Sequence, residues 1–256
     1  MMTKKQILKW LWKRRLIVSL YCLLISTVWN VGNTHYLRGL AEGINTNATD
    51  PVKKVENILD WLEYRSGLVG ETEGTIGNQR DVIGILSGKQ FLRVCGTASF
   101  AFVNIAKESG LEARRLILMG PGAEAKHVVS EVLIDDKWVV VDPAFTTLMR
   151  DSNGKLLTRE NLKNPAVLKS ATKEMANYQD RFTYENATHL RFESVPLLGK
   201  TARWTLNLIN SNWEDHVERF ISLFNQNSSI AALVSFVFVL CSIPGSERPR
   251  AQLPVI

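Results

Sequence analysis

The chain has 256 residues and a formal net charge of +6. Six Lys and Arg residues within the first 15 positions account for the whole excess, because the 25 basic residues after them balance 25 acidic ones. The rest of the chain has no basic excess that would predict nucleic-acid binding, and the positive charge is a signal of membrane topology instead.

Residues 1–36 predict a cytoplasmic basic segment followed by a transmembrane anchor. Residues 16–31 are mostly apolar, and with residues 30–36 as an interfacial end they approach the roughly 20 residues needed to cross a bilayer. A basic flank before an apolar run keeps the N-terminus in the cytoplasm. A cleaved signal peptide is the alternative, but no small-x-small cleavage site follows the run, so we expect an uncleaved anchor. The basic residues of the flank are Lys4, Lys5, Lys9, Lys13, Arg14 and Arg15.

The next segment predicts a linker and then a helix. Residues 37–50 are rich in Gly, Asn, Thr and Asp, a composition typical of a linker. Asp50 suits the N-cap of a helix and Pro51 its first position, and this helix opens a domain over residues 51–227 that is long enough for one core. The apolar residues of the helix share one face: Val52, Val55, Ile58, Leu59 and Leu62.

Cys95 lies at the start of a second predicted helix. Apolar residues recur at helical spacing after it, and Gly110 stands where a left-handed C-cap is expected. Unpaired N–H groups and the positive end of the helix dipole favour a thiolate at such a position. The position alone does not predict catalysis, because a cysteine at a helix start is more often a plain buried residue.

Three β-branched and aliphatic runs follow, at residues 112–119, 126–134 and 137–141, and they predict strands. Gly120-Pro121-Gly122 separates the first two runs and Asp135-Asp136 the last two, and both are typical of turns.

The length of the turn at Asp135-Asp136 decides where two polar side chains point. An even loop of two or four residues makes His127 and Asp142 diagonal neighbours on one face of the ladder. A three-residue loop puts them on opposite faces. The even register thus brings a base and its orienting carboxylate together, and it leaves only the Cys95 helix to be packed against that face.

A cysteine, a histidine and an aspartate together predict an activated nucleophile, in which the base takes the thiol proton and the acid fixes the ring. The order of Cys95 and the blocks at 109–114, 127–132 and 137–143 resembles the core of the transglutaminase-like superfamily over roughly residues 80–150. The resemblance implies a papain-like α+β fold, with N-terminal helices and a nucleophile helix packed on an antiparallel sheet. Terminal transmembrane helices complete the predicted fold class.

By motif match, Cys95 takes the nucleophile position of that family, His127 the base and Asp142 the orienting acid. Two positions depart from the family pattern, which often has Gly two residues before the cysteine and an aromatic residue two after the histidine. This chain has Arg93 and Val129 there. Neither position belongs to the triad, so the departures concern substrate preference more than chemistry.

Acyl transfer also needs hydrogen-bond donors for the oxyanion. The backbone N–H of Cys95 is one candidate, because it lies at a helix start. Gln90 is a candidate for a side-chain donor, as a glutamine just before the nucleophile is in the broader papain-like group. The alternative is that Gln90 is a solvated loop residue.

The region after the motif gives a weaker indication. Residues 156–162 predict a short helix that Asn164-Pro165 closes, and the part of it at residues 158–162 carries a further resemblance. This stretch, with residues 184–186 and 195–196, resembles transglutaminase-like proteins found with bacterial surface-polysaccharide genes, which implies a role at the cell envelope.

The C-terminal residues 228–256 predict a second transmembrane segment and a short basic tail. Residues 230–243 are apolar, which is short for a span, and Arg248 and Arg250 suit a cytoplasmic tail. Both termini would then be inside and the domain outside. The alternative is a buried or interfacial helix.

Cysteine usage agrees with this layout, because Cys22 and Cys241 lie in the two apolar segments and Cys95 alone lies in the domain. No CxxC pair, HExxH motif or acidic metal loop is present, so neither a metal nor a cofactor is expected. For His189 and His216, outside the motif, a surface or structural role is expected.

These patterns predict a thiol acyl-transfer enzyme anchored in a bacterial inner membrane, with its domain on the extracytoplasmic side. Cys95 would attack an amide of a peptide, protein or other envelope substrate, and His127 would protonate the departing amine. With water as acceptor the enzyme is an amidase or peptidase, and with an amine it is a crosslinking transferase. The alternative is a non-catalytic module of the same fold that binds a partner, although such members usually lose part of the triad.

Overall fold

The computed structural model describes residues 4–68, 81–89, 92, 94–121, 124–190 and 227–242, with a few single positions between 205 and 217. The helices are α1 (Lys4–Ile44), α2 (Pro51–Leu68), α3 (Val82–Gly84), the π-helical turn η1 (Ile85–Lys89), α4 (Cys95–Glu108), α5 (Arg159–Leu162), α6 (Pro165–Ala171) and α9 (Asn227–Ser242). The strands are β1 (Ala113–Met119), β2 (Ala125–Ile134), β3 (Lys137–Asp142), β4 (Thr147–Leu148) and β5 (Ala187–Thr188). Met1–Gly32 and Asn227–Ile256 form one compact unit, and Asn33–Gln226 form a second.

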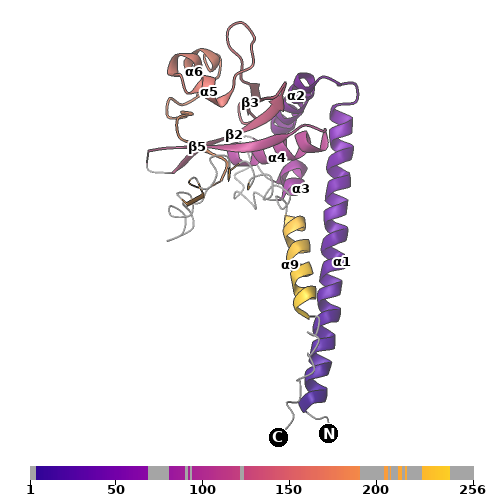
Figure 1. The fold of residues 1–256 in the computed structure, drawn as a ribbon. Coiled ribbons are helices and arrows are strands. Elements are labelled where there is room, and N and C mark those ends of the chain that lie inside the picture. The colour runs from indigo at the N-terminus through magenta and orange to yellow at the C-terminus, as the bar shows by residue number, and fades with distance from the viewer. Residues whose placement is uncertain are drawn as a thin grey trace. The chain divides into compact units, whose positions relative to one another are not determined.

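The first unit pairs the beginning of α1 with α9, and the two helices lie side by side (Figure 1). Near one end, Asn30 accepts hydrogen bonds at Oδ1 from the hydroxyls of Ser228 at 3.0 Å and Ser229 at 2.8 Å. Near the other end, the hydroxyls of Ser19 and Ser242 are 3.4 Å apart. Because the start of α9 meets the later residues of α1 and its end meets the earlier ones, the helices are antiparallel.

The predicted linker at residues 37–50 is wrong over its first half, because α1 continues to Ile44. Leu37 and Ala41 are fully buried in the core of the second unit, and Ile44 packs against the same cluster. Positions i, i+4 and i+7 lie on one face of a helix, so this spacing gives the segment a buried stripe. The glycine-rich composition of residues 37–50 led to the prediction of a linker instead of this helix.

One helix in the described part of the chain is long and apolar enough to cross a membrane by length and composition, and it is the portion of α1 at residues 14–44. Helix α9 is apolar as well but has 16 residues. At about 1.5 Å per residue it is about 24 Å long, shorter than the roughly 30 Å of hydrocarbon in a bilayer. The second span therefore stays a prediction.

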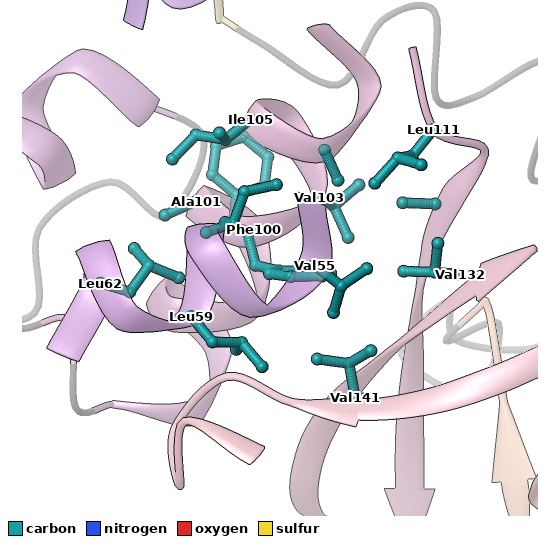
Figure 2. Close-up of a cluster of buried hydrophobic side chains, with 14 of the residues drawn as sticks. Val55, Leu59, Leu62, Phe100, Ala101, Val103, Ile105, Leu111, Val132 and Val141 are labelled. Carbon is teal, nitrogen blue, oxygen red and sulfur yellow. The ribbon is translucent and has the colours of Figure 1, made fainter. Parts of the chain in front are cut away.

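Helices α2 and α4 pack together over one face of the sheet. Asp50 caps α2 as predicted, since its carboxylate accepts a hydrogen bond from the backbone N–H of Lys53 at 2.8 Å. Figure 2 shows the apolar side chains of both helices meeting those of the strands, with Val55, Phe100 and Val132 near the middle. Gly110, at φ +78°, ends α4 in the left-handed conformation expected of it.

The five strands form an antiparallel sheet in the order β4-β3-β2-β1-β5. Strands β2 and β3 are joined by a two-residue turn in which Asp135 and Asp136 have φ values of +48° and +59°. Positive φ at both central residues is the geometry of a tight hairpin that matches the twist of the strands. Leu133 pairs with Trp138 across the turn, so the even register is confirmed.

Successive residues of these strands alternate between two buried faces. The helix face packs against α2 and α4, and its strand residues are Ala113, Val132, Ile134, Val139, Val141 and Leu148. The opposite face, here called the site face, packs against α5, α6 and the segment after them, and its strand residues are Leu116, Leu118, Val129 and Val140. Figure 1 shows α4 on one side of the sheet and α5 and α6 on the other.

The α+β fold class is confirmed, with helix α4 packed on an antiparallel sheet, but one expected packing contact is wrong. His127 and Val129, two residues apart on β2, share the site face, whereas α4 covers the helix face. The short helix predicted at residues 156–162 begins only at Arg159 as α5, because Leu156 and Thr158 form β-bridges, and Pro165 opens a further helix, α6, rather than only closing the first.

Candidate active site

His127 and Asp142 form a buried pair on the site face of the sheet. Nε2 of His127 lies 2.7 Å from Oδ2 of Asp142, and the side chains are 4% and 0% exposed. The other carboxylate oxygen of Asp142 accepts hydrogen bonds from the backbone N–H groups of Ala144 at 3.1 Å and Phe145 at 3.4 Å. Because a carboxylate only accepts, we assign the Nε2 proton to His127, which leaves Nδ1 as the ring nitrogen for a further partner.

Cys95 is that partner. It is the first residue of α4, and the N-cap residue Val94 has no side-chain hydrogen bond to the first turn. The sulfur lies close enough to the His127 side chain and to the backbone of Val128 and Gly96 for all three to lower the pKa of the thiol. The thiol is partly exposed, whereas the imidazole and carboxylate behind it are buried. The structure thus brings the three predicted residues into one connected group.

Helix α4 reaches this group with its N-terminal end rather than with its flank. Ser99, one turn into the helix, donates a hydrogen bond at 2.9 Å to the backbone carbonyl of Val128. Val128 follows His127 on the same strand and points to the helix face, because successive residues alternate. The helix is thereby fixed to the strand that carries the base, and Cys95 meets the ring from the end of the sheet.

The charges of the group favour a thiolate beside an imidazolium. Burial opposes ionisation of the Cys95 thiol, but the hydrogen bond and charge of His127, with the backbone of Val128 and Gly96, hold its pKa below the ordinary value. Burial likewise opposes the charged form of His127, yet its hydrogen bonds and charge interactions with Asp142 and Cys95 raise the pKa to about 9. Both shifts favour the ion pair that a thiol nucleophile and its proton donor need.

Three aromatic residues enclose the His127 ring, and the sequence motif contains none of them. The Phe182 ring stacks on it with centroids 4.3 Å apart and planes 13° apart. Phe145 and Tyr178 meet the ring edge-on, at 5.8 and 6.2 Å. No pattern in the sequence predicts them, because Tyr178 and Phe182 lie in an irregular segment without periodicity.

A cavity of about 550 Å³ borders the residues that follow Asp142 in the chain. It is lined by residues 143–147, which directly follow Asp142, by the end of α2, by Leu92 and by the residues around Met175. Phe145 belongs both to the cavity wall and to the aromatic set around His127. Cys95, His127 and Asp142 are not among the described residues of its lining, so Phe145 is the residue that connects the cavity with the base.

The remaining predicted residues fall in different places. Gln90 and His216 lie outside the described residues. His189 has a structural environment and not a surface one, since its side chain is 5% exposed and its Nε2 lies 2.8 Å from a carboxylate oxygen of Glu131. Within the described residues, no group of three or more His, Cys, Asp or Glu side chains is placed to hold a metal ion.

Residues 38–143 match the family model described as the transglutaminase-like superfamily. Cys95, His127 and Asp142 all lie inside the matched range, whereas Phe145 and Phe182 lie beyond it. Neither the comparison with curated proteins nor the comparison with solved structures gave a match.

Proposed function

The chain carries a transglutaminase-like superfamily domain at residues 38–143, and from this premise we propose that the protein is a cysteine-dependent acyl-transfer enzyme acting on amide bonds. The observation that carries the proposal is the connected set of Cys95, His127 and Asp142, in which a partly exposed sulfur meets a buried and charged base. A thiol, a base and an orienting acid in contact are the parts that covalent acyl transfer needs.

In the proposed reaction, the Cys95 thiolate attacks the amide carbonyl carbon and forms a carbon–sulfur bond. The carbon–nitrogen bond then breaks, and the proton on Nδ1 of His127 passes to the departing amine. The acyl group stays on Cys95 as a thioester. An acceptor, which is water, an amine or a hydroxyl compound, gives its proton to His127 as it attacks the thioester, and the thiolate and imidazolium are restored.

The negative charge on the carbonyl oxygen needs donors during both attacks. The backbone N–H of Cys95 suits this role, because the first N–H groups of a helix have no partner within the helix. Gln90 remains the proposed side-chain donor. Asp142 keeps the ring oriented and supports its positive charge, and its buried carboxylate, which also accepts hydrogen bonds from two backbone N–H groups, is well held for that task.

A non-catalytic module of the same fold is the second candidate, because members of the superfamily can lack activity. A binding module has no need for a thiol poised beside a buried imidazolium. Burying a charged histidine and aspartate is costly unless they are paired, and here the pairing leaves Nδ1 available to the one thiol in the domain, which interacts with the ring. This arrangement favours the enzyme.

We further propose that α1 anchors the enzyme in a bacterial inner membrane and that α9 returns to the cytoplasmic side as a partner helix. The basic flank of α1 sets its direction, and the antiparallel contacts between Asn30 and Ser228 support the return. The domain would then act outside the cytoplasm, on a peptide, protein or other amide-bearing substrate of the cell envelope.

Alkylation by iodoacetamide tests the proposed nucleophile. In a Cys22→Ala/Cys241→Ala background, Cys95 is the only thiol, so labelling of the full chain reports on it alone. We expect alkylation near neutral pH well above the rate of a free thiol, and no labelling after Cys95→Ala. A rate equal to that of a free thiol, in protein that is folded, would overturn the proposal.

A further inference from the structure

The stacking of Phe182 on His127 is the closest aromatic contact of the base. The two rings are nearly parallel and overlap at 4.3 Å between centroids, and Phe182 is 6% exposed. It belongs to the core cluster of the site face. It also lies outside the matched residues 38–143, so the family match does not assign it a role.

We propose that Phe182 is a positioning residue for His127, which holds the imidazolium plane between Cys95 and Asp142 and stabilises its charge. The inference rests on the proposed function, because only a reacting base needs its plane fixed. Under this inference, the segment that follows α6 contributes a residue to the site in addition to the three motif residues.

The hydrogen bonds of His127 explain why such a residue is needed. Asp142 engages Nε2, and Cys95 interacts with the same ring, on which Nδ1 is the remaining nitrogen. Even two fixed nitrogens would allow the ring to tilt about the line that joins them. A flat surface parallel to the ring opposes that tilt, and Phe182 supplies one.

The stack also affects the charge of the base. The face of an aromatic ring carries partial negative charge and attracts a cation above it. Phe182 therefore favours the imidazolium over the neutral ring, and it keeps water from that side of the pair. Because the thiolate of Cys95 depends on the neighbouring positive charge, a weaker imidazolium means a smaller thiolate fraction at neutral pH.

Other ionisable groups near the His127 ring also affect its charge. Asp142 and Cys95 contact His127 directly, and Tyr178 meets it edge-on. Burial raises the pKa of Tyr178 above its ordinary value, so it stays neutral through the pH range of interest. The Arg181 guanidinium lies 5.8 Å from the Phe182 ring centroid and competes for the same π system. Tyr184, fully buried, stays neutral as well.

The segment that carries Phe182 is anchored to the site face by its own contacts. The hydroxyls of Tyr178 and Tyr184 are 3.4 Å apart, and the backbone N–H of Phe182 donates to the carbonyl of Gln179 at 2.9 Å. These contacts hold the loop without Phe182's side chain. A substitution that removes the aromatic ring but keeps an apolar group of similar size can therefore leave the loop in place.

Two substitutions at position 182 distinguish the effect of the aromatic ring from the effect of the volume that it fills. Phe182→Leu keeps an apolar side chain but has no aromatic face, and Phe182→Tyr keeps the face. Phe100→Leu makes the same change as Phe182→Leu at a fully buried residue in the core of the helix face, and it serves as control. The readout is the rate of iodoacetamide alkylation of Cys95 against pH, in the full chain with Cys22→Ala and Cys241→Ala.

For Phe182→Leu we expect alkylation at pH 6.5 to be roughly threefold to tenfold slower, and the rise of the profile to move roughly half a unit to one unit to higher pH. Phe182→Tyr and Phe100→Leu should leave the profile unmoved. An unmoved profile for Phe182→Leu overturns the inference, and so does an equal shift for Phe182→Tyr or Phe100→Leu. A slow, ordinary thiol in the unsubstituted protein would instead overturn the proposed function and this inference with it.

Discussion

Nε2 of His127 and Oδ2 of Asp142 lie 2.7 Å apart although 15 positions separate the two residues in the chain. The two-residue turn at Asp135 and Asp136 is the reason, because an even register places both side chains on the same face of the hairpin. One added residue in the turn would direct the carboxylate to the opposite face.

Asp142→Asn should disable the base while it preserves the shape of the site. An amide carries no charge to support the imidazolium, and its NH₂ group favours the wrong tautomer of the ring. We expect the rate of Cys95 acylation by p-nitrophenyl acetate to fall by roughly 10³-fold to 10⁴-fold, by analogy with the same change in a serine protease triad. Asp136→Asn, in the exposed turn, is the matched control and should keep the full rate. Equal rates for both variants would show that Asp142 has no role.

The rate of iodoacetamide alkylation of Cys95 and the rate of amide turnover should respond differently to high pH. Both should already be fast below the ordinary thiol pKa, because the pKa of Cys95 is lowered. As pH rises through about 9, His127 loses its proton and can no longer protonate the leaving amine, so amide turnover should fall. The thiolate persists, and iodoacetamide alkylation should not fall with it. Parallel profiles up to pH 10 would contradict the assignment of His127 as the proton donor.

Glu131→Gln should destabilise the domain without changing the reactivity of the Cys95 thiol. The buried carboxylate of Glu131 pairs with Arg114 at 2.8 Å and with His189 at 2.8 Å, so a neutral amide leaves two donors without their shared negative charge. We expect the free energy of unfolding to fall by about 3 kcal/mol, measured by urea unfolding of the full chain in detergent. Glu160→Gln, whose pair with Lys163 is exposed, should change it by less than about 0.5 kcal/mol.

The same carboxylate sets a pH dependence of stability. Burial opposes its charge, but His189 and Arg114 hold its pKa below the ordinary 4.5. A lowered pKa stabilises the fold above the unfolded-state value, and that stabilisation is lost as pH falls through the folded-state value. The wild-type protein should therefore lose stability below pH 4.5 more steeply than Glu131→Gln. Identical acid dependence would mean that the pairing contributes nothing.

The contact between α1 and α9 can be trapped as a disulfide. Asn30 and Ser229 hydrogen-bond at 2.8 Å, so cysteines at both positions should crosslink on mild oxidation of membranes that contain the full chain. Val28 is exposed on α1, and the pair Val28→Cys with Ser229→Cys should not crosslink. Cys22 and Cys241 are replaced by Ala in both variants. Equal crosslinking of the two pairs would contradict the specific contact.

Local patterns in the sequence were enough to predict the elements of the site, and they reduced its register to an even or an odd turn, of which the structure has the even one. The β-branched runs and the Asp135-Asp136 turn predict a hairpin that brings His127 and Asp142 together, because strand periodicity fixes the face of each residue. Helical periodicity also predicts α4, but it only says that one side of the helix is buried. It does not say which face of the sheet lies beneath it, and the expected contact with the site face is wrong.

Two further features were not predicted for different reasons. Glycines at positions 39 and 43 gave residues 37–50 the composition of a linker, although Leu37 and Ala41 are spaced to bury one face of α1. Phe182 lies in an irregular segment whose contacts are all long-range, and no local pattern connects it with His127.

A burst experiment tests most directly whether Cys95 carries an acyl group. The full chain with Cys22→Ala and Cys241→Ala is mixed with p-nitrophenyl acetate near neutral pH, and p-nitrophenolate release and the mass of the protein are followed together. A rapid release of about one equivalent is expected, with an acetyl thioester on Cys95 that hydroxylamine removes, and Cys95→Ala should show neither. Release without a burst, or at the same rate after Cys95→Ala, would contradict acyl transfer through this residue.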